Sequence, residues 1–379
     1  MALKILSIFG TRPEAIKMAP VVRALQRSAD FESVVCVTGQ HREMLDQIMR
    51  SFDLVADFDL NVMAQAQSPA EVAARVLAQL PAILREVKPD MVLVQGDTTT
   101  TCAAALASFL ERIPVGHVEA GLRTGDLAQP FPEEMNRRVT TVVSTLHFAP
   151  TEDARKALLA EAVPAARILM AGNTVIDALL QSVRADYVFE NPLLNDLPAN
   201  RKLLLVTMHR RESIGDPMRS VTQAILRIKA AHPELLVVIP THRNPAVREI
   251  VLGALSDKPG VLLIDPLPYL DFVHLMARSY LILTDSGGVQ EEAPSLKRPV
   301  LVIRDVTERP EGVAVGVARL LGTDADTIVR NVHELLTDTA AYNAMVGPPN
   351  PYGDGKAADR IVEAILAWSR SGDSCQPCA

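Results

Sequence analysis

With 379 residues the chain is longer than one hydrophobic core usually supports, so its length predicts two domains. Hydrophobic residues make up 48% of the chain and charged residues 22%, which is typical of globular domains, and the net charge of -7 argues against general nucleic-acid binding. No apolar run reaches the roughly 18 residues that a membrane-spanning helix needs, and the first residues do not resemble a signal peptide, so no membrane contact and a cytoplasmic location are expected.

Two series of short, nearly continuous apolar runs divide the chain. The first series comprises residues 5–9, 34–37, 91–94, 115–118 and 167–170, and the second comprises residues 203–206, 235–239, 261–264, 281–283 and 300–303. Segments with helical periodicity separate the runs, a pattern that predicts parallel sheets covered on both faces. The sequence therefore predicts an α/β protein with two doubly wound, Rossmann-like domains and a ligand cleft between them.

The boundary between the domains is expected within residues 177–200, where Pro and Asn interrupt periodic structure. The last helical pattern, residues 357–369, is expected to cross back onto the first domain. The predicted domains are therefore residues 1–178 with 357–379, carrying the acidic residues, and residues 179–356.

Polar strings follow the apolar runs, at the point where the carboxyl edge of a parallel sheet binds ligands in open α/β folds. The string GTRPE after the first run opens a helix, and Thr11 and Glu14 have capping-box spacing. Arg12 beside the free amides of that helix indicates a phosphate or carboxylate site. Lys17, one turn further along, fits a solvated charge as well as a ligand contact.

Acidic residues gather after the next runs of the first half. Asp97 precedes four threonines and fits a helix N-cap as well as a chemical role, whereas Glu119 ends the neighbouring strand on the same rim. Glu133 and Glu134 begin a helix, where the helix dipole alone explains one of them. Acidic positions collected near one edge indicate acid–base chemistry.

The second half shows polar residues in corresponding places. His209 and His242 follow its first two runs, and each fits a hydrogen-bonding residue as well as a catalyst. The string DSGG, residues 285–288, joins a run to a helix; it fits a tight turn, but its glycines and the helix amides suit a diphosphate. Arg309 adds a cation in a later loop.

The sequence contains no dinucleotide-binding fingerprint, no P-loop and no zinc-ligand spacing, so neither a metal nor a cofactor is expected. Cys375 and Cys378 have redox spacing but lack a second ligand pair, whereas Cys36 and Cys102 fit buried thiols.

Together and in order, these strings closely resemble the non-hydrolysing UDP-N-acetylglucosamine 2-epimerases, from Phe9 through Arg309 and on to residues 351–360. The resemblance implies the two-domain GT-B fold, a homodimer and a UDP-sugar bound in the interdomain cleft. It also implies interconversion of UDP-GlcNAc and UDP-ManNAc for polysaccharide synthesis. The implied mechanism is an anti elimination of UDP that gives 2-acetamidoglucal, followed by re-addition.

The resemblance assigns residues to three groups. The catalytic group is Asp97, Glu119, Glu133 and His209. The substrate contacts are Arg12, Lys17, Phe272, Ser286, Gly287, Gly288, Glu292 and Arg309. A second UDP-GlcNAc, acting as an activator, would bind at Gln40, His41, Glu43, Arg210 and His242.

Two positions depart from the family pattern: Gly39 and Gln95 stand where members commonly have Ala and His, and neither change removes a charged catalytic group. Other functions share the fold and the UDP site. They are a GT-B glycosyltransferase, an epimerase that hydrolyses its intermediate, a 2-epimerase for a modified UDP-sugar, and a non-catalytic UDP-sugar sensor. The assignment of each carboxylate to one face of the sugar stays open.

Overall fold

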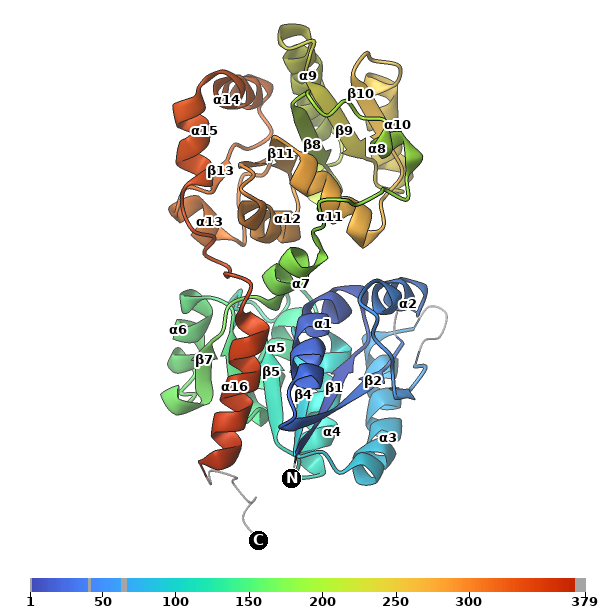
Figure 1. Ribbon diagram of the computed structural model, residues 1–379, viewed down its shortest axis with the longest axis vertical. Helices are drawn as coiled ribbons and strands as arrows, with labels where there is room; N and C mark the ends of the chain where they lie inside the picture. The colour runs from blue at the N-terminus through green and yellow to red at the C-terminus, as the bar shows by residue number, and fades with distance from the viewer. Residues whose placement is uncertain (1, 40–41, 63–66, 372–379) are drawn as a thin grey trace. The chain divides into compact units, whose positions relative to one another are not determined.

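A computed structural model describes residues 2–39, 42–62 and 67–371, which form two compact units (Figure 1). Unit 1 comprises Met1–Ala178 and Gly353–Ala379, and unit 2 comprises Leu179–Tyr352. Both ends of the chain therefore belong to unit 1, and unit 2 is one continuous insertion.

Unit 1 is built on seven parallel strands in the order β3-β2-β1-β4-β5-β6-β7. The strands are β1 (Leu3–Phe9), β2 (Phe31–Val37), β3 (Phe58–Asp59), β4 (Met91–Gln95), β5 (Val115–Val118), β6 (Leu146–Ala149) and β7 (Ile168–Met170). Strand order reverses between β1 and β4, so the carboxyl ends of these two strands flank the topological switch point where open α/β sheets bind ligands.

Helices cover both faces of the unit 1 sheet. They are α1 (Arg12–Arg27), α2 (Arg42–Ser51), α3 (Pro69–Val87), α4 (Thr99–Leu110), α5 (Glu133–Val143), α6 (Glu152–Ala160), α7 (Thr174–Ser182) and α16 (Ala357–Arg370). The core on one face includes the fully buried strand residues Leu6, Ile8, Val92 and Val94. The continuous apolar runs therefore form the strands of a sheet that is buried on both faces, as is usual for parallel sheets.

Unit 2 repeats the design with six parallel strands in the order β10-β9-β8-β11-β12-β13. The strands are β8 (Leu203–Thr207), β9 (Leu236–Pro240), β10 (Val261–Ile264), β11 (Leu281–Thr284), β12 (Val300–Val302) and β13 (Ala318–Leu320). The helices are α8 (Pro192–Asn195), α9 (Asp216–Ala231), α10 (Pro245–Leu255), α11 (Tyr269–Arg278), α12 (Gly287–Glu292), α13 (Pro310–Ala314), α14 (Ala325–Thr337) and α15 (Thr339–Val346). The switch point of this sheet lies between β8 and β11.

The predicted fold class is confirmed, because both sheets are parallel and doubly wound. Each predicted run overlaps a strand, but the sequence missed β3, β6 and β13. These strands are short, and polar His147 and Arg319 interrupt the apolar character of β6 and β13.

The segment predicted to be a linker, residues 177–200, is packed structure over much of its length. It begins inside α7, which crosses the boundary between the two units. Further along, the fully buried Asp271 carboxylate of α11 accepts hydrogen bonds from the Tyr187 hydroxyl at 2.7 Å and from the backbone amides of Glu190 and Asn191 at 2.9 and 3.0 Å. Pro and Asn interrupt the helical periodicity of this segment, but α11 holds it in place.

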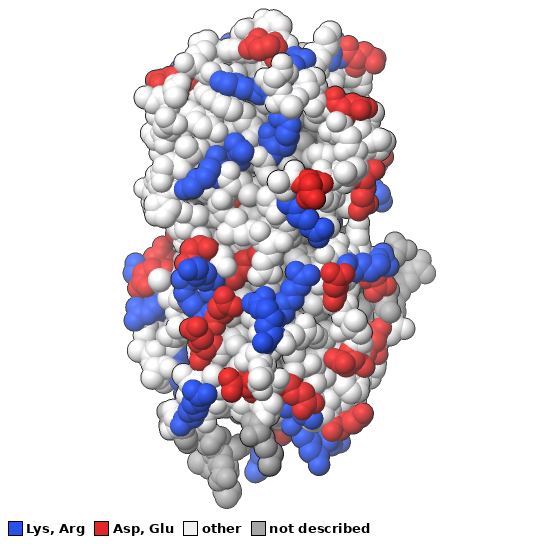
Figure 2. Space-filling model, viewed as in Figure 1, with Lys and Arg blue, Asp and Glu red and all other residues white. Residues whose placement is uncertain are grey.

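Among the described residues, no helix combines the length and the apolar character needed to cross a bilayer. The same part of the chain contains no group of three or more His, Cys, Asp or Glu side chains placed to hold a metal ion. Figure 2 shows basic and acidic side chains interspersed on the face in view.

Candidate functional site

A buried glutamate joins two loops at the switch point of unit 1. Oε2 of Glu14 accepts hydrogen bonds from the backbone amides of Gly10 at 3.0 Å and Thr11 at 2.6 Å. Oε1 accepts from the hydroxyls of Thr98 at 2.7 Å and Thr101 at 2.9 Å. Burial raises the pKa of Glu14 against the effect of these hydrogen bonds. Glu14 therefore forms the predicted capping box with Thr11 and also ties the loop after β1 to the start of α4.

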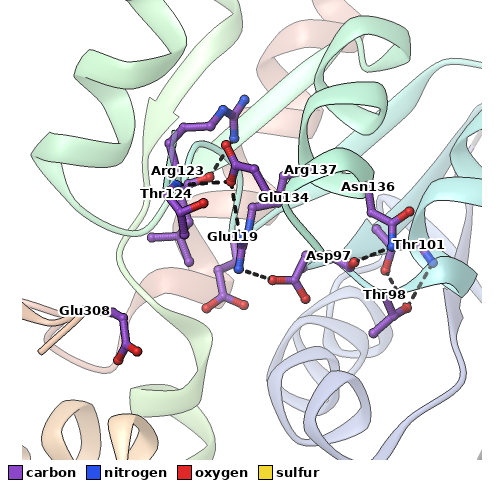
Figure 3. A network of polar contacts seen from close by, with 12 residues as sticks. Asp97, Thr98, Thr101, Glu119, Arg123, Thr124, Glu134, Asn136, Arg137 and Glu308 are labelled. Carbon is purple, nitrogen blue, oxygen red and sulfur yellow. Dashed lines mark hydrogen bonds and ion pairs between the residues drawn. The ribbon is translucent and has the colours of Figure 1, made fainter. Parts of the chain in front are cut away.

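Asp97 is not the N-cap of α4. That role belongs to Thr98, whose hydroxyl accepts a hydrogen bond from the Thr101 amide at 3.1 Å. The Asp97 carboxylate is instead bound by Arg137 of α5, with 2.5 Å between Oδ2 and Nη2 (Figure 3). Its backbone carbonyl accepts a hydrogen bond from Asn136 at 2.9 Å. Because another residue caps the helix, the Asp97 side chain is left for a chemical role.

Glu119 sits directly after β5 in the left-handed backbone region, with φ of 63°. Few residues other than glycine adopt this conformation, so the turn fixes the side chain at some conformational cost. The ammonium of Lys17 lies 2.6 and 2.7 Å from its two carboxylate oxygens, and Gln95 and Asn173 also donate hydrogen bonds. Lys17 is thus the partner of a predicted catalytic carboxylate and not a solvated charge.

The two glutamates at the start of α5 have different surroundings. Glu134 is fully buried and accepts from the Thr124 amide at 3.1 Å and from Arg137 and Arg138 at 3.3 and 3.1 Å. Glu133 has a buried Oε2 without a hydrogen-bond partner among the described residues. The structure therefore gives Glu134 a structural role and leaves Glu133 as the candidate for chemistry.

The charges at this edge act on one another. Burial raises the pKa of Asp97, and the negative charges of Glu119 and Glu133 raise it further. The cations Arg137 and Lys17 oppose this effect and favour the ionised form. The structure thus brings Asp97, Glu119, Glu133 and Lys17 together at one edge of unit 1. Arg12 begins α1 at the same edge and is partly exposed.

At the switch point of unit 2, His209 is held by a buried aspartate that directly follows β11. Oδ1 of Asp285 lies 2.9 Å from Nδ1 of His209, and Oδ2 accepts from the backbone amides of His209 and Arg210 at 2.8 and 2.9 Å. Burial acts to raise the pKa of Asp285, but these contacts outweigh burial and lower it. Because Nδ1 faces the carboxylate, Nε2 is the ring nitrogen left for a ligand.

The predicted cradle, residues 286–288, has room beside its backbone. Ser286 precedes α12, and neither of the next two residues has positive φ. A Cβ atom added at Gly287 would come no closer than 3.9 Å to another atom, and one at Gly288 no closer than 3.5 Å. Neither backbone strain nor crowding within the chain therefore demands glycine at these positions. The space suits the close approach of a ligand to the backbone.

The remaining predicted substrate contacts of unit 2 differ in burial and in their partners within the chain. The Arg309 guanidinium donates to the buried Glu291 through Nε, so that cation already has an intramolecular partner. Phe272 is partly buried in α11, and Glu292 ends α12.

The predicted activator group is described only in part. Gln40 and His41 lie outside the described residues, as does the side chain of Glu43, whose backbone belongs to α2. In unit 2 the rings of His242 and His209 have centroids 6.2 Å apart, and Nη2 of Arg210 lies 3.8 Å from Glu308. The Cys375–Cys378 pair also lies outside the described residues.

The sequence did not single out four residues that hold this site: Glu14 as a link between loops, Arg137, Asn173 and Asp285. Arg137 offered one signal, because it follows Glu133 by four positions and so lies on the same face of α5. The partners of Asn173 and Asp285 are 54 and 76 positions distant, and no local pattern reveals such contacts.

Comparisons with known proteins extend these observations. Residues 23–366 match the family model described as UDP-N-acetylglucosamine 2-epimerase. The UDP-N-acetylglucosamine 2-epimerase of Escherichia coli is 54% identical over 370 residues, which cover 96% of this chain and 98% of that protein. The chain therefore belongs to the UDP-N-acetylglucosamine 2-epimerase family.

Two solved structures of 2-epimerases are similar along almost the whole chain. The UDP-GlcNAc 2-epimerase from Neisseria meningitidis bound to UDP-GlcNAc has a TM-score of 0.85 and 47% identity, and covers 96% of this chain and 100% of its own. The Methanocaldococcus jannaschii UDP-GlcNAc 2-epimerase in complex with UDP-GlcNAc and UDP has a TM-score of 0.76 and 34% identity, with 97% and 100% covered.

Proposed function

We propose that this chain is a non-hydrolysing 2-epimerase that reversibly converts UDP-GlcNAc into UDP-ManNAc. Family membership supports the reaction, since the relatives named above carry this activity in their names and two of them are bound to UDP-GlcNAc. The observation that carries the proposal is the gathering of Asp97, Glu119 and Glu133 at the switch point of unit 1. A group of carboxylates whose charges act on one another is suited to move protons.

The chemistry explains why several acids are needed. No carbonyl group acidifies the C2 proton of the sugar, so departure of UDP must lead. The C1–O bond breaks with its electrons moving to the diphosphate, a base takes the C2 proton, and a C1=C2 double bond forms in 2-acetamidoglucal. UDP then adds back to C1 while a proton reaches C2 on the opposite face. Two faces of one ring require two groups that handle protons, and a positioned group contributes about 10²–10⁴-fold.

The switch points of the two units have different proposed roles. Asp97, Glu119 and Glu133 of unit 1 handle protons, and Arg12 and Lys17 contact the substrate. The ion pair with Glu119 supports a second role for Lys17, which is to hold that carboxylate in position.

In unit 2, His209 assists catalysis, while Ser286 and the glycine amides hold the departing diphosphate. Glu292 would bind the ribose, with Phe272 and Arg309 near the nucleotide. The space beside Gly287 and Gly288 supports the diphosphate role. One preorganised donor to a developing negative charge is worth about 3 kcal/mol.

The chain is proposed to act as a cytoplasmic homodimer. A second UDP-GlcNAc is proposed to bind as an activator at Gln40, His41, Glu43, Arg210 and His242.

One experiment tests the function. The enzyme is incubated with UDP-GlcNAc in deuterated water and the products are followed by NMR. UDP-ManNAc should form, and both UDP-GlcNAc and UDP-ManNAc should carry deuterium at C2. Release of free ManNAc and UDP would indicate a hydrolysing enzyme. A requirement for an acceptor would indicate a glycosyltransferase, and binding without turnover a sensor. Turnover of a diacetamido sugar nucleotide in preference to UDP-GlcNAc would change the proposed substrate.

A further inference from the structure

Arg137 of α5 occupies a fixed position between two carboxylates (Figure 3). Nη2 lies 2.5 Å from Oδ2 of Asp97, and Nη1 lies 3.3 Å from Oε2 of Glu134. The side chain is only 13% exposed. Glu134 is itself fully buried and bound by the amide of Thr124. The guanidinium is therefore a cation anchored on one side and bound to a predicted catalytic group on the other.

A cation in this position has two effects on its partner. The planar guanidinium restricts the orientation of the carboxylate, which a single-point ammonium does less well. Its charge also favours the ionised form of a buried acid.

We propose that Arg137 is a positioning residue that fixes the orientation of the Asp97 carboxylate and supplies its counter-charge. The inference rests on the epimerase function proposed above. Arg137 acts through Asp97 and is assigned no contact with the sugar.

All the charged groups that act on Asp97 enter the expected pH dependence. Glu119 at the end of β5 and Glu133 of α5 raise the pKa of Asp97, as burial does, whereas Arg137 and Lys17 of α1 lower it. Loss of the Arg137 charge removes the larger of the two opposing cation effects, so the pKa of Asp97 must rise further. The limb of the pH profile that reports Asp97 then moves to higher pH, whether Asp97 acts as the base or as the acid.

The neighbouring arginine provides a matched control. Nε of Arg138 lies 3.1 Å from Oε1 of Glu134, so Arg138 shares that buried partner with Arg137. Its side chain is 42% exposed, and its described ion pair is with Glu134 and not with Asp97. Arg138→Met therefore removes a similar contact to Glu134 and leaves Asp97 untouched.

The experiment measures kcat and kcat/KM against pH for the full-length wild type, Arg137→Met, Arg137→Gln, Arg137→Lys and Arg138→Met, with UDP-GlcNAc as substrate. We expect Arg137→Met and Arg137→Gln to lose about 10²-fold in kcat. Their pH profiles should move upward by about one pH unit. Arg137→Lys keeps the positive charge, so its pH profile should lie close to that of the wild type, whereas its kcat should be only partly restored. Arg138→Met should match the wild type within about twofold in rate, since Arg138 is 42% exposed and its described ion pair is not with Asp97.

Two results would overturn the inference. One is an Arg137→Met or Arg137→Gln profile that falls in rate but keeps the pH limbs of the wild type, which is the behaviour of a purely structural residue. The other is failure of both variants to fold, judged by circular dichroism, while Arg138→Met folds. A wild type that does not turn over UDP-GlcNAc would refute the proposed function itself, and that result is seen before any variant is compared.

Discussion

The carboxyl edges of the two sheets hold their polar groups in different ways. In unit 1 the edge carries pairs of opposite charges, Lys17 with Glu119 and Arg137 with Asp97. In unit 2 the corresponding edge offers the glycine backbone after β11 and the buried Asp285, which binds His209, in addition to the ion pair of Arg309 with Glu291. Paired charges tune the protonation of a carboxylate, whereas open backbone admits a phosphate. One topology therefore presents two different polar edges, set by the residues that follow its strands.

The largest expected effect comes from removing a negative charge at the edge of unit 1. Asp97→Asn keeps an oxygen for Arg137 but cannot accept a proton, so kcat should fall about 10³–10⁴-fold. Glu119→Gln should behave similarly. UDP affinity, measured by calorimetry, should change little, because the diphosphate is assigned to unit 2. Near-normal turnover in either variant would contradict the assignment of these carboxylates.

Asp90→Asn is the matched control for that pair. Asp90 is exposed at the opposite, amino end of β4, where its carboxylate accepts the Lys4 amide at 2.7 Å. Its turnover should stay within about twofold of the wild type, since surface substitutions change little.

A smaller effect is expected at the buried aspartate of unit 2. Asp285→Asn can still accept backbone hydrogen bonds but loses the charge that orients His209, so kcat should fall about 10²-fold. Asp265→Asn is the control, because Asp265 also follows a strand of this sheet but is exposed and paired with Arg248. Equal turnover in these two variants would show that the contact between Asp285 and His209 has no part in catalysis.

A substitution in the proposed diphosphate cradle, residues 286–288, should weaken UDP binding without affecting folding. Gly288→Ala meets no close atom in the chain, so folding should be unaffected, while the Kd for UDP should rise about tenfold because the methyl group occupies ligand space. Gly253→Ala in α10 also enters open space, but away from the strand ends. It should leave UDP binding unchanged and stabilise the fold by about 0.5–1 kcal/mol. Unchanged UDP affinity in Gly288→Ala would argue against a diphosphate at this position.

The smallest effect on turnover is expected for a buried carboxylate of unit 1 outside the acidic group. Burial raises the pKa of Asp177 from 3.8 to about 6, although the amides of Ala357 and Ala358 donate to it. Between these pH values the folded state holds a proton that the unfolded state has released. This group therefore lowers the free energy of unfolding as pH rises through the window, by about 2–3 kcal/mol in total.

Asp177→Asn should remove that component. Denaturant titrations at pH 4.5 and pH 7.5 should show a smaller loss of stability in the variant than in the wild type, with kcat unchanged. A large loss of turnover in Asp177→Asn would show that the need for a carboxylate in catalysis is not confined to the acidic residues at the edge of unit 1.

Local patterns predicted the strands and the positions directly after them. The apolar run at residues 115–118 coincides with β5, so Glu119 was placed correctly at a strand end. Continuous apolar runs identify parallel strands because both faces of such a sheet are buried. The same criterion fails for β6, where His147 lies within the strand and is nevertheless buried.

Contacts between distant segments could not be predicted from the sequence. Arg137 reaches Asp97 across 40 positions, and this contact depends on the rotation of α5 about its axis. Glu14 has capping-box spacing with Thr11, and that local pattern gives no sign of its hydrogen bonds to Thr98 and Thr101, 84 and 87 positions away. Hydrophobic periodicity sets which face of a helix is buried, but it does not specify which polar residue that face meets.

Because unit 2 interrupts unit 1, the order of synthesis constrains folding. Helix α16 packs against α1, buries Ile361 and Ile365, and starts at the amides held by Asp177. Every residue of unit 2 leaves the ribosome before this helix does. Unit 2 can therefore fold during translation. Unit 1 cannot complete its packing until α16 has emerged, and the surface of α1 that α16 covers stays exposed until then.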